Sequence, residues 1–280
     1  MVAWTERDLV VNGARLRAYR TGRRGAPSVL LAHGLTDNAR YWTRTVEALE
    51  RDYDVVLYDA RGHGHSERTT GPFGQEARAG DLAAVVEAYA LEAPVLIGHS
   101  MGAGTVAAAA AHRPELARAV VLEDPAWMDR PAPSAAQVQA YFAEWKAWLL
   151  ALRAKSRQEA LAMRRASEPD WSDGDLSLSL DARLACDPRV LDDYQPEGAP
   201  WREIVAAIQC PVLLLTGEPE RGALVTPQVA AAAAGLWRSG RWVHLAGASH
   251  SIRFSRFEAY IGGLREFLGD SHALRNLSER

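Results

Sequence analysis

The sequence predicts an α/β protein built on a doubly wound, mostly parallel sheet. Three observations lead to this class. Short apolar runs recur, each bounded by a turn signal, and helical stretches lie between them. The runs are continuous rather than alternating, which is typical of parallel strands covered on both faces. Strands that alternate with helices in this way predict a doubly wound sheet.

The elements can be placed in chain order. Residues 8–22 alternate around Asn12-Gly13, a strong turn signal, so the sheet is expected to open with an antiparallel hairpin. In residues 75–92 the apolar side chains fall near one face, as in an amphipathic helix. The further strands are expected at 29–34, 54–62, 94–100, 119–125, 211–218 and 241–247, and the helices at 40–50, 75–92, 101–112, 227–237 and 252–268.

One region interrupts this alternation. Between Pro125 and Pro200 the chain shows no convincing strand; two amphipathic helical segments begin after Pro133-Ser134, and a polar, Asp-rich stretch follows them. A structureless loop of that length would be improbable in a compact domain. We therefore expect a helical cap inserted after the sixth expected strand, 119–125. The expected domains are a core, 1–125 and 201–280, and a cap, 126–200.

Composition and charge limit the partners. The 280-residue chain is 48% hydrophobic and 24% charged, which is a globular composition, and its net charge of -3 gives no reason to expect nucleic acid or an anionic membrane as partner. Cys186 and Cys210 lack a zinc-like spacing and are interpreted as free thiols, which fits a reducing compartment. No apolar run is long enough for a signal peptide or a transmembrane helix. We expect a cytoplasmic protein and leave its oligomeric state open.

The stretch VLIGHSMGAG (95–104) places a serine between two glycines where a strand becomes a helix. A side chain at the tip of so tight a turn needs a strained backbone with positive φ. Gly98 and Gly102 then face each other across the turn, where only very small residues fit. The turn exposes Ser100 Oγ above the carboxyl end of the sheet and aims the Met101 N–H at developing negative charge. This is the pattern of a nucleophile elbow, G-x-S-x-G.

A nucleophilic serine needs a base, a group that orients the base, and a second oxyanion donor. His250 is the candidate base, because it lies in the loop between the last expected strand and the final helix. The second donor is expected to be the Leu35 N–H, with His33 holding that loop by hydrogen bonds. His63 and His65 suggest a metal pair, but no third ligand follows at usable spacing, so neither metal nor cofactor is expected.

With these residues in place, the sequence resembles the α/β-hydrolase superfamily along essentially its whole length. The order Ser, acid, His is also the one expected there. The resemblance implies a compact core with a helical cap, similar to the esterase, lactonase and cofactor-free haloperoxidase-like branch. Ser100 argues against epoxide hydrolases and haloalkane dehalogenases, which use an Asp nucleophile. The segments that carry the resemblance are HGLTDNARYW, YDARGHGHSE, GHSMGAG, PVLLLTGEPE and GASHS.

The acid is where the chain departs from the superfamily's pattern. The acid usually follows strand seven there, as an Asp three residues after a glycine. This chain has Glu220 at that position, with Glu218 nearby. Some relatives place the acid at the end of strand six, where this chain has Glu123 and Asp124. We favour Glu220, because the spacing is met and glutamate can orient a histidine, and keep the strand-six pair as the alternative.

The resemblance implies a serine hydrolase that cleaves a small-molecule carboxylic ester or lactone through an acyl-enzyme, without a cofactor. Two alternatives stay open: peracid formation from a carboxylic acid and hydrogen peroxide on the same triad, and a ligand receptor that keeps the triad. In the cap, Trp127, Trp145 and Trp148 are expected either to pack against the core or to line a substrate pocket. The particular ester or lactone stays open.

Overall fold

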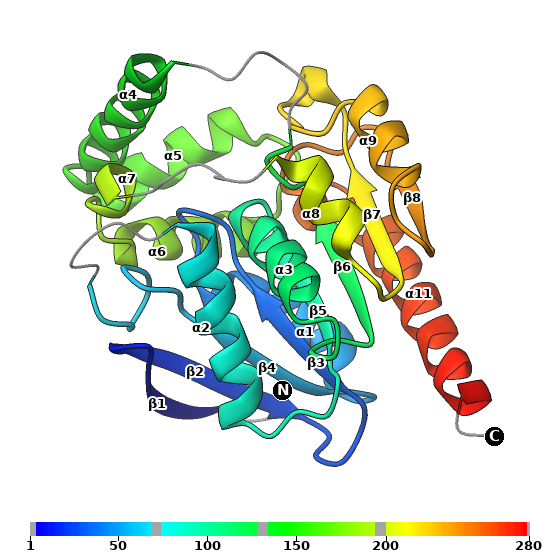
Figure 1. Cartoon of the computed structure of the whole chain (residues 1–280). Coiled ribbons are helices and arrows are strands. Elements are labelled where there is room, and N and C mark those ends of the chain that lie inside the picture. The colour runs from blue at the N-terminus through cyan, green and yellow to red at the C-terminus, as the bar shows by residue number, and fades with distance from the viewer. Residues whose placement is uncertain (1–3, 69–73, 128–133, 194–199, 279–280) are drawn as a thin grey trace.

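A sheet of eight strands forms the centre of the computed structural model (Figure 1), which describes residues 4–68, 74–127, 134–193 and 200–278, without the side chains of 135, 193 and 271–278. Its strand order is β1-β2-β4-β3-β5-β6-β7-β8. β1 and β2 form the predicted hairpin, and β2 also pairs antiparallel with β4; all other neighbours are parallel. The strands are β1 (Thr5–Val11), β2 (Ala14–Gly22), β3 (Ser28–Ala32), β4 (Asp54–Tyr58), β5 (Val95–His99), β6 (Ala119–Glu123), β7 (Val212–Thr216) and β8 (Gly240–His244).

Helices cover both faces of this sheet (Figure 1). Successive strand residues belong to opposite cores: Leu30 and Leu96 pack under one layer of helices, and Leu31 and Ile97 under the other. Double coverage explains why the strands are apolar without alternation, and the predicted doubly wound fold is confirmed. The first layer is α2 (Gln75–Ala88), α3 (Met101–His112), α8 (Trp201–Ala207) and α9 (Pro227–Ala234); the second includes α1 (Thr43–Leu49) and α11 (Phe257–Ser278).

Between β6 and α8, the described residues form four helices, here called the inserted helices, which lie over the carboxyl ends of the strands (Figure 1). The first two match the two predicted helical segments, and each begins with a capping box, at Ser134 and at Ser156. The Asp-rich stretch, for which the sequence predicts no helix, forms the third. Ser172 caps it, and Asp173 and Asp175 occupy its first turn, where negative charge is favourable. The inserted helices are α4 (Ala135–Arg153), α5 (Arg157–Ser167), α6 (Asp173–Ala185) and α7 (Val190–Asp193).

The junctions of the inserted helices with the core are described only in part. Residues 128–133 and 194–199, which belong to the expected cap 126–200, lie outside the described residues. On the core side, α6 packs against the 3-10 helix η1 (Ala39–Trp42), where Tyr41 and Trp171 share a small apolar cluster. This contact joins the inserted helices to the loop after β3. Among the described helices, none combines the length and apolarity needed to cross a membrane.

Candidate active site

The turn between β5 and α3 holds Ser100 in a strained conformation. Its φ of 53° and ψ of -116° lie outside the regions that residues with a side chain ordinarily occupy. A Cβ at Gly98 would lie 2.2 Å from the Gly102 carbonyl oxygen, and one at Gly102 would lie 2.2 Å from that of Ala32. Backbone packing therefore requires both glycines, as predicted. Ser100 is the N-cap residue of α3, but its side chain makes no capping hydrogen bond.

Sheet register ties this turn to the end of β6. The Ser100 N–H donates to the Glu123 carbonyl oxygen at 2.9 Å. One residue further, the Asp124 N–H donates to the Leu215 carbonyl oxygen of β7, also at 2.9 Å. Asp124 has a φ of 42°, in the left-handed region that Asp and Asn tolerate better than most residues. The peptide group that joins Glu123 to Asp124 is thus held by hydrogen bonds to the turn after β5 on one side and to β7 on the other.

Asp124, and not Glu220, is the carboxylate that contacts His250. Asp124 Oδ2 lies 2.6 Å from His250 Nδ1, and the same carboxylate accepts the N–H groups of Leu224 and Val225 at 2.8 Å and 3.0 Å. The structure corrects the preference for Glu220 at this position. Glu220 is exposed in the 3-10 helix η2 (Pro219–Arg221), because the chain turns toward the surface directly after β7.

The two other candidate carboxylates hold the backbone around His250. Glu218 Oε1 accepts the Gly247 N–H at 2.7 Å. Glu123, fully buried, accepts the backbone N–H of Arg253 at 3.0 Å and its guanidinium at 2.8 Å. The loop that carries His250 is therefore anchored on both sides by carboxylates that bond its flanking residues.

The environment of His250 favours the protonated imidazole. Burial alone would lower the pKa of His250, but the hydrogen bond to Asp124 and its negative charge raise that pKa above the ordinary value. The charges of Glu123 and Asp37 act in the same direction. The side chain remains 32% exposed, whereas that of Asp124 is fully buried. The Nδ1 edge of the imidazole is therefore held by Asp124, and part of the ring remains exposed.

Asp37 is a buried carboxylate that sequence analysis does not single out. It accepts the Gly34 N–H at 3.2 Å, and its Oδ2 lies 3.3 Å from His99 Nδ1. Burial alone would raise the pKa of Asp37, but His99 and the nearby guanidinium groups of Arg183 and Arg253 hold it well below its usual range. Its position inside HGLTDNARYW was the available signal, yet an Asp there also fits an ordinary turn.

His99 links Asp37 to the loop that carries His250. Its Nε2 lies 3.2 Å from the His250 carbonyl oxygen, and the two imidazole rings have centroids 4.7 Å apart. Because His99 directly precedes Ser100, these contacts hold His250 beside the elbow. His99, the last residue of β5, thus has a packing role that the sequence pattern alone does not reveal.

The two predicted oxyanion donors lie on segments that meet at this cluster. Met101 is the first residue of α3, so its N–H has no acceptor within the helix. In the described chain, the Leu35 N–H likewise makes no hydrogen bond with another backbone group. A Cβ at Gly34 would lie 2.9 Å from His99 Nδ1, so close packing of this loop against β5 requires glycine. Binding of an oxyanion by Leu35 and Met101 stays a prediction.

Two further histidines near the site have structural contacts. His33 Nδ1 lies 2.8 Å from the Gly34 carbonyl oxygen, and its Nε2 accepts the Ala60 N–H at 2.9 Å, the loop-holding role expected for it. His63 lies against the Leu35 carbonyl oxygen, and burial lowers the pKa of His63 to about 4. Within the described ranges, no group of three or more His, Cys, Asp or Glu residues could hold a metal ion.

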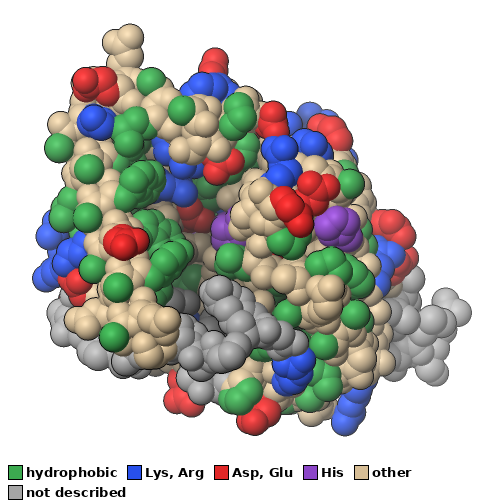
Figure 2. Space-filling view, turned by 90° about the horizontal axis from the view of Figure 1, so that it is seen from above, with side chains coloured by type: hydrophobic (Ala, Val, Ile, Leu, Met, Phe, Trp, Pro, Cys, Tyr) green, Lys and Arg blue, Asp and Glu red, His purple; other side chains and the backbone are tan. Residues whose placement is uncertain are grey.

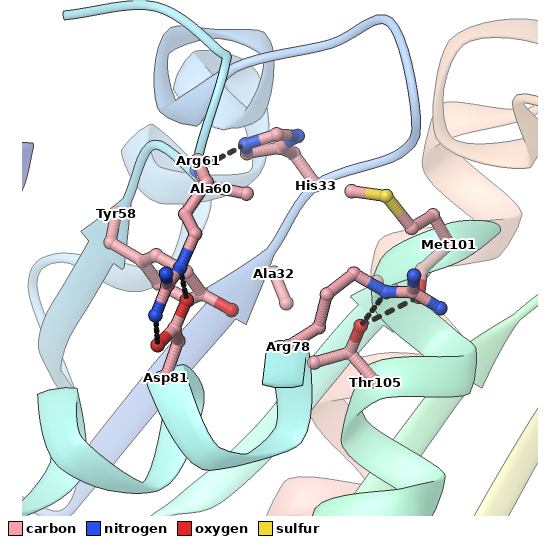
Figure 3. A pocket seen from close by; sticks show the side chains of 10 residues that line it. Ala32, His33, Tyr58, Ala60, Arg61, Arg78, Asp81, Met101 and Thr105 are labelled. Carbon is pink, nitrogen blue, oxygen red and sulfur yellow. Dashed lines mark hydrogen bonds and ion pairs between the residues drawn. The ribbon is translucent and has the colours of Figure 1, made fainter. Parts of the chain in front are cut away.

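A small cavity lies behind the elbow and is closed by charged side chains (Figure 3). Its volume of about 10 Å³ has room for about one water molecule. Figure 3 shows Arg61 directed at Asp81, with hydrogen bonds of 2.6 Å and 2.7 Å, and Arg78 directed at Thr105. This cavity is too small for a substrate.

A larger cavity of about 340 Å³ lies among the inserted helices. Trp145 and Trp148 line it and are half-buried; that they contact a substrate stays a prediction. Trp127 does not match the pocket expectation: it is 1% exposed and stacks on Trp201 with ring centroids 5.4 Å apart, so it packs in the core. The cavity lining is Tyr141, Glu144, Trp145 and Trp148 of α4, Arg164 of α5 and Arg183 of α6.

Similarity to known proteins covers most of the chain. The family model described as the alpha/beta hydrolase fold matches residues 27–256. N-formylmaleamate deformylase of Pseudomonas putida is 28% identical over 93% of this chain and 95% of its own. The structure of the enol-lactonase from Burkholderia xenovorans aligns with a TM-score of 0.74 at 25% identity, over 94% of this chain and 100% of that chain. Carboxylesterase CesB from Bacillus subtilis, 18% identical, shares the fold with a TM-score of 0.73 over 95% of this chain and 92% of its own.

The elbow packing predicts that Gly98→Ala destabilises the protein. The added Cβ would overlap the Gly102 carbonyl, and overpacking of this kind costs about 1–3 kcal/mol. Calorimetry should show a melting temperature lower by several degrees. Gly262→Ala in α11 is the matched control, because its Cβ meets no atom within 4 Å and alanine favours a helix by roughly 0.5–1 kcal/mol. Equal melting temperatures for the two variants would contradict the packing argument.

The Asp124–His250 contact predicts the titration of His250. By NMR, its imidazole should titrate above about 6.5, the ordinary histidine value. Asp124→Asn should lower this pKa, because burial then acts without the opposing charge, and asparagine accepts the left-handed backbone. Glu220→Gln should leave it unchanged. An equal shift in both variants would show that Asp124 is not the group that raises it.

The raised pKa of His250 also makes the stability of the folded protein depend on pH. Because the folded-state pKa of His250 is raised, its charged pair with Asp124 contributes stability that is fully present below the unfolded pKa. That contribution is lost as the pH rises through the folded pKa. The difference in melting temperature between the parent and Asp124→Asn should therefore narrow from about pH 5 to about pH 9. A difference that widens over this interval would contradict the raised pKa.

Proposed function

This chain belongs to the alpha/beta-hydrolase fold family, and we propose that it is a serine hydrolase of a small-molecule carboxylic ester or lactone. The contact of Asp124 with His250 beside the strained turn of Ser100 is the observation that supports it most strongly. In the proposed reaction Ser100 attacks the acyl carbon and His250 takes its proton. Leu35 and Met101 bind the oxyanion with their N–H groups.

Asp124 has the orienting role in this mechanism. By accepting from Nδ1, it fixes the tautomer in which Nε2 of His250 is free to accept the serine proton. Its charge then stabilises the imidazolium that forms, and the raised pKa makes His250 a stronger base. His250 returns the proton to the leaving group, and a water molecule activated in the same way releases the acyl group from Ser100. No cofactor takes part in these steps.

A second candidate bond is the amide of an N-acyl group. The deformylase that aligns over 93% of this chain is the observation that favours it. The same residues would serve, but a leaving amine must be protonated as it departs, which increases the demand on His250 as an acid. A screen of graded esters and lactones beside N-formyl and N-acetyl amides separates the two bonds.

The inserted helices are proposed to form a cap, 126–200, over this site. Their cavity, lined by Trp145 and Trp148, supports this role. Two other functions predict different behaviour in the same screen. A ligand receptor would give one slow turnover of 4-nitrophenyl butyrate, and a peracid-forming enzyme would act on a carboxylic acid only with hydrogen peroxide. Steady turnover of the ester without peroxide supports the hydrolase.

The proposed triad predicts the order of three variants in kcat/KM with 4-nitrophenyl butyrate. Ser100→Ala should lose about 10⁴-fold or more, and Asp124→Asn about 10⁴-fold, because the tautomer is no longer fixed. Glu220→Gln is the matched control on the exposed loop and should stay within about twofold of the parent, a loss too small for any triad member. Activity of Ser100→Ala near the parent level would refute the serine mechanism. If Glu220→Gln lost most of kcat/KM while Asp124→Asn kept most of it, the triad acid would be Glu220, in the loop after β7.

The parent's rate should also depend on pH through His250. The base must be neutral to accept a proton, so the rate should fall on the acid side. Because the pKa of His250 is raised, the midpoint should lie above about 6.5. A rate that stays flat down to about pH 5 would contradict a histidine base.

A further inference from the structure

We propose that Arg164 and Arg183 bind a carboxylate of the substrate, so that the compound hydrolysed is an anion with its charge held among the inserted helices. The reaction rests on the proposed function, whereas the anion site itself does not. Both arginines line the cavity of about 340 Å³. Figure 2 shows a hollow on this side of the molecule, with hydrophobic side chains along one wall and charged side chains at its floor.

Arg164 is a buried cation whose donors are not used by the protein. The residue is 5% exposed, its Nε has no hydrogen-bond partner, and the nearest carboxylate oxygen, Glu168 Oε1, is 3.8 Å from Nη2. Its guanidinium lies over the ring of Trp171 at 5.4 Å, a contact that uses none of its five N–H donors. Because unpaired donors are costly to bury, an acceptor brought by a ligand would be stabilising here.

Arg183 extends the positive charge toward the elbow. Its Nη1 donates to the Ser179 carbonyl oxygen at 3.1 Å and to the Ser179 hydroxyl at 2.6 Å, which fixes the direction of the side chain. Its Nε has no partner, and Nη1 lies 3.9 Å from Asp37 Oδ1, beyond hydrogen-bond distance. Asp37 in turn lies 3.3 Å from His99, which precedes Ser100, so a chain of neighbouring charged groups joins Arg183 to the elbow.

The two guanidinium groups act on one another across the cavity. Burial and the charge of Arg183 lower the pKa of Arg164 to about 10, which leaves both groups cationic at neutral pH. The neighbouring carboxylates offset only part of the positive charge of these two guanidinium groups. Glu168 lies at 3.8 Å, and burial raises its pKa, while Glu144 at the cavity edge is exposed. A ligand carboxylate offers two oxygens in the planar geometry that guanidinium groups recognise best.

The rest of the cavity indicates what joins this carboxylate to the scissile bond. Trp145, Trp148 and Tyr141 give one apolar wall along α4. A ligand with a carboxylate at the arginines and its acyl carbon at Ser100 would place a short apolar spacer against this wall. The substrate class is therefore a carboxylic acid that carries the ester, lactone or amide on a short spacer.

Binding to the Ser100→Ala protein tests the anion site without requiring turnover. Calorimetric titration would compare mono(4-nitrophenyl) adipate with methyl 4-nitrophenyl adipate, which differ only in the charge of one terminus. The anion should bind about 10- to 100-fold more tightly, as expected for a charge-assisted pair with a buried arginine. Equal affinity for the two esters would overturn the proposal.

Single substitutions in the same background assign the effect to the arginines. Arg164→Gln and Arg183→Gln should each reduce the preference for the anion to within about threefold of unity. Arg157→Gln is the matched control on α5, because this arginine is 51% exposed and pairs with Asp181. It should keep the full preference. If either cavity variant fails to fold, as judged by its thermal melt, the other one and the comparison of the two esters decide the proposal.

The outcomes separate the anion site from the reaction. If the Ser100→Ala protein prefers the anion but the parent hydrolyses neither ester, the anion site stands and the proposed reaction fails. If the parent hydrolyses both esters and the Ser100→Ala protein binds them equally, the reaction stands and the anion site fails. A preference retained in both arginine variants would also overturn the assignment to Arg164 and Arg183.

Discussion

Close backbone packing around the turn after β5 fixes the position of Ser100, and the other groups of the site are arranged around it. Gly98 faces Gly102 at a separation that excludes any Cβ, and Gly102 in turn lies against the carbonyl of Ala32. The turn is therefore packed against β3 as well as against itself. The Ser100 N–H also donates a hydrogen bond to the Glu123 carbonyl oxygen of β6. The strained serine is thus placed between β3, whose following loop carries Leu35, and β6, whose end carries Asp124.

The end of β6 organises the other half of the site through two consecutive carboxylates. Glu123 holds the backbone and guanidinium of Arg253, and Asp124 holds the ring of His250. The loop between β8 and α10 (Ile252–Ser255) and the first turn of α10 are thereby bound to one strand end. Asp124 also accepts the N–H groups of Leu224 and Val225, so the carboxylate that sets the histidine's pKa also holds a neighbouring loop in place.

The inserted helices contribute charge as well as apolar surface. The chain has a net charge of -3, yet Arg164 and Arg183 are held inside the molecule with carboxylates near but not bonded to them. The order of the helices explains how they meet. α4 supplies the aromatic wall, and α5 and α6 each supply one arginine, so the cavity requires the Asp-rich stretch to be helical.

The sequence by itself determined the doubly wound sheet, the hairpin at its start and the glycines that flank Ser100, because each depends on spacing within a few neighbouring residues. It also placed His250 in a loop at the carboxyl edge of the sheet. Only the tertiary structure chose Asp124 over Glu220. That contact joins residues 126 positions apart, and the spacing along a loop does not fix where a side chain points. The same limit applies to Asp37 and the cavity arginines, whose partners come from distant segments.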